Sequence, residues 1–322
     1  MSGATETLHK PVMLAEVMQV LGPRDGEIYI DATFGAGGYS RAMLESAECR
    51  VYAIDRDPQV VMLADALARD FPGRFLLLTG CFGDMLSLME AEGVASVDGI
   101  VMDLGVSSMQ IDQPDRGFSF RFDGPLDMRM GSCTLDAATL VNHLPADELA
   151  DILYQYGEEK ASRKIAAAIV AAREIAPIET TTQLADIVRS VVRKTDKIDP
   201  ATRTFQALRI KVNDELGEIE RALASAPHLL RPGGRLIAVS FHSLEDRIVK
   251  RFLRPQSKAI SRHDPHFMLQ QEEAVNAHFD LPQSKPIHAS DEESYVNPRA
   301  RSAKLRVAIR NEVPVLHGES ET

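Results

Sequence analysis

The sequence IYIDATFGAGG, residues 28–38, is the part of this chain that most directly predicts its fold. The apolar residues at its start predict a strand, the glycines from Gly35 onward predict a tight turn, and a helix is expected from about Ser40. A second apolar run, residues 51–54, ends at Asp55. Glycines let a backbone approach a ligand closely, and an acid after the second strand can accept hydrogen bonds from ribose hydroxyls. The pattern therefore predicts an α/β sheet that holds an adenosine-containing molecule.

The glycine turn also favours one class of adenosine ligand. Gly35, Gly37 and Gly38 are followed by Tyr39 and a serine. The loop therefore departs from the dinucleotide fingerprint at its last position, and no lysine follows as in a phosphate-binding P-loop. The acid at the end of the first strand, Asp31, is a poor neighbour for a pyrophosphate but a good one for a cation. S-adenosylmethionine (SAM) is a sulfonium with an ammonium group and no phosphate, so the turn favours SAM over NAD. A glycine turn that binds nothing is the simpler alternative.

Composition indicates an ordinary globular protein. The 322 residues are 44% hydrophobic and 26% charged, and no apolar run approaches the ~18 residues of a membrane span. The polar N-terminus has no apolar core of a signal peptide. Three widely spaced cysteines, Cys49, Cys81 and Cys133, form no C-x-x-C pair, which argues against a zinc site and a disulfide framework. We therefore expect a cytoplasmic protein without a bound metal.

The charge of the chain is unevenly distributed. The net charge of -11 argues against nucleic-acid binding. However, residues 189–211 contain seven basic and two acidic residues, and residues 297–310 contain five basic residues and no acid. A local basic surface can bind phosphates on an acidic protein, although these residues would equally suit ordinary solvated surfaces. Arg299, Arg301 and Lys304 are our candidates for RNA contacts in the second stretch.

The order of predicted elements indicates two domains. Strand-like runs at residues 27–34, 50–57, 74–80 and 98–105 alternate with helical patterns, which predicts a parallel, doubly wound sheet. From residue 132 to about 198 the chain is predicted to be helical only. A long amphipathic helix at 202–230 then leads to a fifth strand at 235–241. Residues 256–293 are expected to be irregular, and 303–310 to form a half-buried strand.

We therefore expect a discontinuous α/β domain of residues 1–112 and 214–322, with an inserted helical domain of residues 113–213. An insertion after the fourth strand is expected to lie over the carboxyl ends of the strands, where ligands bind in such sheets. A helical cap in that place suits a large substrate, so we assign substrate and RNA recognition to the insert.

Asp103, at the end of the fourth predicted strand, is a candidate catalytic residue. In methyl transfer to an exocyclic amine such as cytosine N4, the nitrogen lone pair is delocalised into the ring. Hydrogen-bond acceptors for the amine N–H groups favour a nitrogen whose lone pair points at the methyl group, and Asp103 with a backbone carbonyl of residues 104–107 could supply them. The alternative is a structural role, in which Asp103 binds a nearby loop amide.

Other candidate substrate residues are weaker on sequence grounds. A base must leave its stack to be modified, and Phe118 and Phe120, close to Arg116, could hold it, although phenylalanines more often pack in a core. His242 follows the fifth predicted strand, where it could accept the amine proton or orient the base. Ser243, with Asp246 three residues later, predicts the start of the next helix, and a histidine beside such a start is more often structural.

Ordered segments over nearly the whole chain resemble the bacterial ribosomal small-subunit (16S) rRNA cytosine-N4 methyltransferase family. The matching segments are HKPVML (9–14), residues 31–40, residues 98–110, RGFSF (116–120), GPLDMRM (124–130), RTFQALRI (203–210), residues 232–252 and NPRARSAKLR (297–306). Several of them exceed ten residues, which makes the resemblance much more specific than the glycine turn.

The resemblance implies SAM-dependent methylation of cytidine N4 in the decoding region of small-subunit rRNA, in the cytoplasm. It also implies a class I methyltransferase fold, which is Rossmann-like and doubly wound, with an inserted all-helical substrate domain, and a homodimer. The cofactor contacts that it implies fall on Gly37, Gly38, Tyr39, Asp55, Phe82, Asp103 and Gln110, in addition to Gly35 of the turn. Phe82 would stack near the adenine. The family usually has histidine in the place of Tyr39, so that position is expected to contribute at least its backbone.

Three other functions are consistent with parts of the sequence. A DNA amino-methyltransferase would use similar chemistry, but its Asp-Pro-Pro-Tyr-type motif is replaced here by Asp103-Leu104-Gly105-Val106. A non-catalytic RNA-binding assembly factor could keep a methyltransferase fold, although the intact Asp55 and Asp103 argue against such decay. A nicotinamide dehydrogenase is the weakest alternative.

Overall fold

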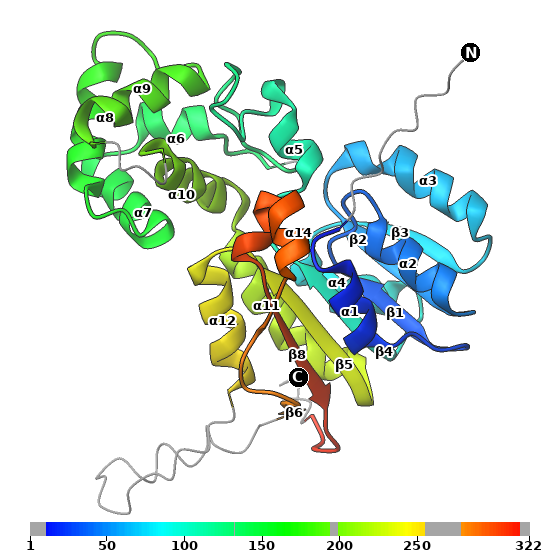
Figure 1. The fold of residues 1–322 in the computed structure, drawn as a ribbon. Coiled ribbons are helices and arrows are strands. Elements are labelled where there is room, and N and C mark those ends of the chain that lie inside the picture. Colours follow the sequence, from blue (N-terminus) through cyan, green and yellow to red (C-terminus); the bar gives the residue numbers. More distant parts are fainter. Residues whose placement is uncertain (1–10, 132, 194–198, 255–277, 316–322) are drawn as a thin grey trace, which may run out of the picture. The chain divides into compact units, whose positions relative to one another are not determined.

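The structure is a computed structural model that describes residues 11–131, 133–193, 199–254 and 278–315. It divides into two compact units, of which the first joins Met1–Gly105 to Gly217–Thr322 and the second is Val106–Leu216. In Figure 1 the first unit comprises the blue-to-cyan and the yellow-green-to-red parts of the ribbon, and the second comprises the turquoise-to-green part between them in the sequence. The units divide at residues 105/106 and 216/217, whereas the sequence predicted boundaries at 112/113 and 213/214.

The first unit is built on one sheet with the strand order β3-β2-β1-β4-β5-β8-β6, in which β7 also pairs with β8. Its parallel strands are β1 (Ile28–Asp31), β2 (Arg50–Asp55), β3 (Phe75–Thr79), β4 (Val97–Asp103) and β5 (Leu230–Ser240). Its antiparallel strands are β8 (Lys304–Arg310), β6 (Phe279–Asp280) and β7 (Ile287–His288). The chain moves outward from β1 to β3 and then returns to β4. The order therefore reverses between β1 and β4, and ligands bind at the carboxyl ends of the strands at such a point.

Helices precede, connect and follow the parallel strands of this unit. They are α1 (Leu14–Leu21), α2 (Gly38–Ser46), η1 (Pro58–Val60), α3 (Val61–Asp70), η2 (Phe82–Asp84), α4 (Met85–Ala91), α11 (Glu215–Leu229), α12 (Ser243–Leu253), α14 (Asp291–Val296) and η5 (Pro298–Ser302). The central strands carry apolar side chains on both faces, and Ile30, Ile100 and Ile237 are fully buried. Such continuous apolar strands are typical of a parallel sheet that helices cover on both faces.

The second unit is helical throughout its regular elements. These are α5 (Ser108–Asp112), η3 (Pro114–Arg116), α6 (Ala137–His143), α7 (Ala146–Gly157), α8 (Ser162–Arg173), α9 (Thr181–Val191) and α10 (Ala201–Asn213). Leu149, Leu153, Ile165, Leu184 and Leu208 are among the side chains of its own hydrophobic core. A separate core of this kind is what allows an inserted segment to fold as a domain.

The predicted single helix over residues 202–230 is wrong. α10 ends at Asn213 and α11 begins at Glu215, because Asp214 between them has a left-handed backbone with φ of 49°. Its N–H donates to the carbonyl of Ile210, which closes the end of α10. Aspartate tolerates this conformation better than most residues. Since both helices are amphipathic, the helical periodicity continues across the break and does not reveal it.

Two further predictions about secondary structure differ from what the structure shows. β5 starts at Leu230, ahead of the predicted start at residue 235. Of the stretch that was predicted to be irregular, residues 256–277 lie outside the described part. Residues 278–293 contain β6, β7 and the first turn of α14, so that part of the prediction is wrong. A two-residue strand is too short to show an alternating pattern, which explains the error. Among the described helices, none has the length and apolar composition needed to cross a membrane.

Asn213 ties the last helix of the helical unit to the loop before α6. Its amide nitrogen donates to the carbonyl of Met128 at 2.7 Å and to that of Arg209 at 2.9 Å, and its amide oxygen accepts from the N–H of Met130 at 2.9 Å. The side chain is fully buried. These bonds hold Met128 in the left-handed conformation, with φ of 62°.

We predict that Asn213→Ala lowers the free energy of unfolding by about 2 to 4 kcal/mol, because it leaves buried backbone groups without partners. Urea unfolding followed by circular dichroism measures the change. The control is Gln155→Ala at an exposed position of α7, which is expected to change stability by less than about 0.5 kcal/mol. Equal effects of the two substitutions would show that the Asn213 bonds add no stability.

Candidate functional site

Three carboxylates meet at the carboxyl ends of adjacent parallel strands. Asp31, Asp55 and Asp103 are the last residues of β1, β2 and β4. The negative charge of Asp55 contributes to raising the pKa of Asp31, and that of Asp31 contributes to raising the pKa of Asp103. The three side chains therefore interact, as expected where parallel strands end along one edge of a sheet.

The glycine turn lies between the first two of these acids. The N–H of Gly35 donates to Oδ2 of Asp55 at 2.8 Å. Gly35 and Gly37 have positive φ angles of 52° and 77°, and Gly37 is the N-cap of α2. A Cβ on Gly37 would lie 2.7 Å from the ring of Phe34. The turn thus requires glycine at Gly37 for both backbone conformation and space.

Residues 11–13 pack on the beginning of α2. A Cβ on Gly38 would lie only 2.2 Å from Cγ of Pro11, and the hydroxyl of Tyr39 donates to the carbonyl of Val12. The N–H of Met13 donates to Oε1 of Glu293 in α14 at 2.8 Å. The Tyr39 side chain is therefore buried under the N-terminal segment. Burial raises its pKa well above the ordinary value, so the phenol stays protonated and keeps donating.

Asp31 is fully buried but well provided with hydrogen bonds. Its Oδ2 accepts from the N–H of Ser40 at 3.1 Å and from the Ser40 hydroxyl at 2.7 Å. Burial raises its pKa to about 6, against the opposing effect of these hydrogen bonds. The carboxylate is therefore mainly ionised at pH 7. This charge sits at the first turn of α2, where the helix dipole favours an anion.

Asp103 is less well satisfied. Its backbone N–H donates to Oγ1 of Thr33 at 2.7 Å, which fixes the end of β4. Its Oδ1 atom is buried and has no hydrogen-bond partner among the described residues. Burial, together with the negative charges of Asp31 and Glu245, raises its pKa well above the ordinary value. A buried acceptor without a partner needs an explanation, and a bound cation or an N–H donor would supply one.

Asp55 ends β2, and Phe82 lies in η2, which follows β3 in the chain. Oδ1 of Asp55 accepts from the N–H of Asp57 at 2.9 Å, and burial raises the pKa of the Asp55 carboxyl. Phe82 is the first residue of η2, with two residues between it and the end of β3, and it is only partly buried. An acid after β2 and a partly exposed aromatic ring after β3 can contact the ribose and the base of an adenosine.

His242 is held by Glu245 at the start of α12. His242 is the N-cap of this helix, and its Nδ1 accepts from the N–H of Glu245 at 3.4 Å. Its Nε2 lies 3.0 Å from Oε1 of Glu245, whose Oε2 accepts from the N–H groups of Phe241 and His242. The predicted cap at Ser243 is wrong by one residue, because the imidazole and Glu245 form the capping box. The H-S-L-E spacing at 242–245 is the signal that could have identified Glu245.

Four predicted site residues lie in the helical unit. Gln110 closes a capping box in α5, where its side-chain oxygen accepts from the N–H of Ser107 at 3.0 Å. Phe118 belongs to the hydrophobic core and is 8% exposed, with the Arg116 guanidinium 5.6 Å from its ring. Phe120 is half-buried and packs edge-on against Phe205, with ring centroids 4.8 Å apart. These contacts make Phe118 a packing residue, whereas part of Phe120 remains accessible.

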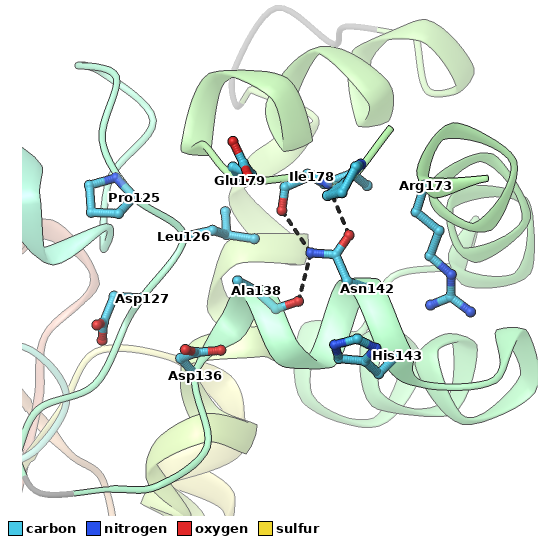
Figure 2. Close-up of a pocket in the computed structure, with 11 residues that line it drawn as sticks. Pro125, Leu126, Asp127, Asp136, Ala138, Asn142, His143, Arg173, Ile178 and Glu179 are labelled. Atoms are coloured by element: carbon cyan, nitrogen blue, oxygen red, sulfur yellow. Dashed lines mark hydrogen bonds between the residues drawn. The ribbon is translucent and has the colours of Figure 1, made fainter. Parts of the chain in front are cut away.

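The helical unit also contains a cavity of about 570 Å³, which the sequence did not indicate. Its lining includes Asp136, His143, Arg173 and Glu179 together with apolar side chains. Figure 2 shows Asn142 in the wall, bound to Ala138 and to both backbone groups of Ile178. This amide and the Arg173 guanidinium both line the cavity. Each also donates a hydrogen bond to a backbone carbonyl, which fixes it as part of the wall.

The predicted RNA-contact residues near the end of the chain differ in how they are engaged. The Lys304 ammonium lies 3.2 Å from Oδ2 of Asp246, and Arg306 binds the other carboxylate oxygen at 2.7 Å. Nε of Arg301 donates to the carbonyl of Ser294 at 2.9 Å, and its remaining side chain is exposed. Arg299 is intermediate in exposure. Lys304 thus has a structural partner, whereas the Arg301 side chain is largely exposed to solvent.

Comparisons with known proteins identify the family. The model of the MraW methylase family matches residues 6–311. A protein of Rhodospirillum rubrum named "Ribosomal RNA small subunit methyltransferase H" is 56% identical over 319 residues, which cover 96% of each chain. Proteins of the same name from Paramagnetospirillum magneticum and Gluconobacter oxydans are 56% and 57% identical, over 95% of this chain and 96% and 94% of theirs. The family model spans nearly the whole chain, including the glycine turn and the three strand-end carboxylates. The chain therefore belongs to the MraW methylase family.

Proposed function

We propose that this protein transfers a methyl group from SAM to the N4 amine of a cytidine in the decoding region of small-subunit rRNA. The relatives named above support a ribosomal RNA substrate, and the sequence motifs support cytidine N4. The observation in the structure that carries the proposal is the buried Oδ1 of Asp103, which has no partner among the described residues. It lies at the end of β4, next to the acids that flank the glycine turn.

The residues at the glycine turn fit SAM. The glycine turn gives the backbone between β1 and α2 its positive φ angles at Gly35 and Gly37, and Asp55 is suited to the ribose hydroxyls. Asp31 is charged, and a cation close to Asp103 would favour its ionised form, which suits a ligand with a sulfonium and an ammonium group and no phosphate. SAM supplies a methyl group on an electrophilic sulfonium when it is bound. A pyrophosphate would meet unfavourable charge from the same carboxylates, which disfavours the nicotinamide dehydrogenase alternative.

Asp103 is the catalytic residue in this proposal. Its Oδ1 would accept a hydrogen bond from the N4 amine, which favours localisation of the lone pair on nitrogen. Because burial and neighbouring carboxylates already disfavour the ionised form of Asp103, an N–H donor or a cation at Oδ1 stabilises that form. An acceptor fixed in advance by Thr33 and β4 needs no reorganisation during the reaction.

His242 is assigned a positioning role. Both ring nitrogens face Glu245, and the same carboxylate binds two backbone N–H groups after β5. The proton that leaves a methylated amine is acidic, so the step requires no strong base. We therefore assign the imidazole to holding the start of α12.

The helical unit is proposed to recognise RNA, with Phe120 and Arg116 among its contacts, and Arg299 and Arg301 are proposed to bind phosphates. A cytoplasmic location and a homodimer belong to the same proposal, because the resemblance to the rRNA methyltransferases implies both. The DNA amino-methyltransferase and the non-catalytic assembly factor are not favoured, since the similar proteins are named as ribosomal RNA methyltransferases over almost their full length.

The function is tested by mass spectrometry of nucleosides from small-subunit rRNA in cells with and without the gene. We expect N4-methylated cytidine at one site to disappear without the gene, to return with the wild-type gene and to stay absent with Asp103→Ala. The loss would correspond to a rate reduction of about 10²-fold or more, as found when a preorganised polar group is removed from an active site.

The exposed Asp65 of α3 provides the control for this experiment. Asp65→Ala is expected to restore methylation fully at the same protein level. An unchanged nucleoside profile in the deletion strain would exclude the proposed reaction, and full methylation with Asp103→Ala would remove Asp103 from the catalytic site.

Asp55→Asn is predicted to raise the dissociation constant for SAM by about 10- to 100-fold, because hydrogen bonds to a charged acceptor are worth ~1.5–3 kcal/mol. Isothermal titration calorimetry measures the change. The Asn side chain can still accept from one backbone N–H, so the turn is expected to persist. Asp65→Asn serves as the matched control, and equal affinities of the two variants would mean that Asp55 does not bind the ribose.

Replacement of both Arg299 and Arg301 by glutamate is predicted to weaken rRNA binding and to reduce its salt dependence. Each phosphate contact that is lost lowers the slope of log K against log salt by about 0.7 to 0.9. Filter binding at several salt concentrations measures both quantities. Arg69→Glu, on the exposed side of α3, is the control. Weaker binding with an unchanged slope would indicate a structural role for the two arginines.

A further inference from the structure

Glu218 of α11 is a buried acid that the proposed reaction does not use. Its side chain is fully within the first unit and the residue is only 4% exposed. Removing a carboxylate from water is costly unless hydrogen bonds and an opposite charge compensate. The contacts of Glu218 therefore show which groups compensate for this cost and which part of the structure the acid holds.

Both carboxylate oxygens of Glu218 are engaged. Oε2 accepts from the backbone N–H of Gly83 at 2.7 Å, and Oε1 accepts from Nη2 of Arg221, one turn further along α11, at 2.6 Å. The Arg221 side chain is 47% exposed, so the arginine keeps contact with water while it compensates the buried charge. Gly83 and Glu218 are 135 residues apart in the sequence. The pair thus joins α11 to the turn after β3.

Gly83 is the middle residue of η2, directly after Phe82. A Cβ on Gly83 would lie 2.6 Å from Oε2 of Glu218 and 3.0 Å from Nε of Arg221. The carboxylate therefore approaches the peptide of Gly83 as closely as it does because no side chain is present there. The same carboxylate contributes to raising the pKa of Cys81, after burial, so it lies close to both neighbours of Phe82.

We infer that Glu218 is a positioning residue that fixes the Phe82 ring for the adenine of SAM. This inference rests on the proposed function, in which Phe82 contacts the base. A charge-assisted hydrogen bond to Gly83 removes freedom from the turn, and a ring that is already held in place loses less entropy when the ligand binds. Glu218 itself does not contact the ligand in this role. Its effect is on cofactor affinity and not on the methyl-transfer step.

Glu218→Gln tests the inference in the full-length protein. Glutamine keeps the size of the side chain, but it loses the charge that strengthens the bond to Gly83 and pairs with Arg221. We expect the KM and the dissociation constant for SAM to rise about tenfold, with kcat at saturating SAM within twofold of wild type and little change in melting temperature without ligand.

The control is Glu220→Gln on the same helix, where the exposed carboxylate lies 3.0 Å from Nη2 of Arg251. This substitution removes a charge of the same kind and is expected to leave SAM affinity within twofold. If the two variants bind SAM equally well, Glu218 does not position the turn. A fall in kcat at saturating SAM with unchanged KM would also contradict the inference.

A double-mutant cycle with Phe82→Ala separates positioning from general stabilisation. If Glu218 acts through the Phe82 ring, the double variant Phe82→Ala, Glu218→Gln is expected to bind SAM about as weakly as Phe82→Ala alone. If the fold-increases in the dissociation constant for SAM of the two single variants multiply in the double variant, Glu218 acts independently of Phe82. Failure of the wild-type protein itself to bind SAM would contradict the proposed function, which distinguishes that result from failure of the inference alone.

Discussion

The parallel pairing of β1 with both β2 and β4 is the constraint on which the candidate site depends. It places the ends of three strands along one edge of the sheet and so concentrates the charges of Asp31, Asp55 and Asp103. The repulsion is offset unequally. Asp31 accepts bonds from Ser40, and Asp55 accepts from the glycine turn, but Oδ1 of Asp103 has no such compensation among the described residues. In the proposed function the positive charge of SAM offsets the remaining imbalance, which would link the topology of the sheet to the chemistry of the cofactor.

Local sequence patterns predicted the parts of the site that depend on backbone conformation. The glycines of the turn and the acid after β2 were identified because a tight turn between a strand and a helix allows few residue types. The same local reasoning failed where the backbone changed direction without a glycine or proline, as at Asp214. It also misplaced the cap of α12 by one residue, because the imidazole of His242 takes the place of a hydroxyl or carboxylate there.

Contacts between distant parts of the chain could not be predicted from one sequence. Nothing in the local pattern around Glu218 indicates that it binds Gly83, and nothing around Glu293 indicates that it binds the N–H of Met13. These bonds form because the sheet brings both ends of a discontinuous unit together. The partners therefore become visible only when the topology is known. Phe118 is a related case, since a phenylalanine suited to hold a base is equally suited to the core in which it lies.

The discontinuity of the first unit has a consequence for synthesis of the chain. A ribosome completes β1 to β4 first, then the whole helical unit, and only afterwards β5 and β8. Until β5 emerges, one edge of β4 has no strand to pair with. An unpaired strand edge is a site for wrong pairing with other chains. The helical unit has its own core, so the nascent protein can acquire a folded insert before its sheet is closed.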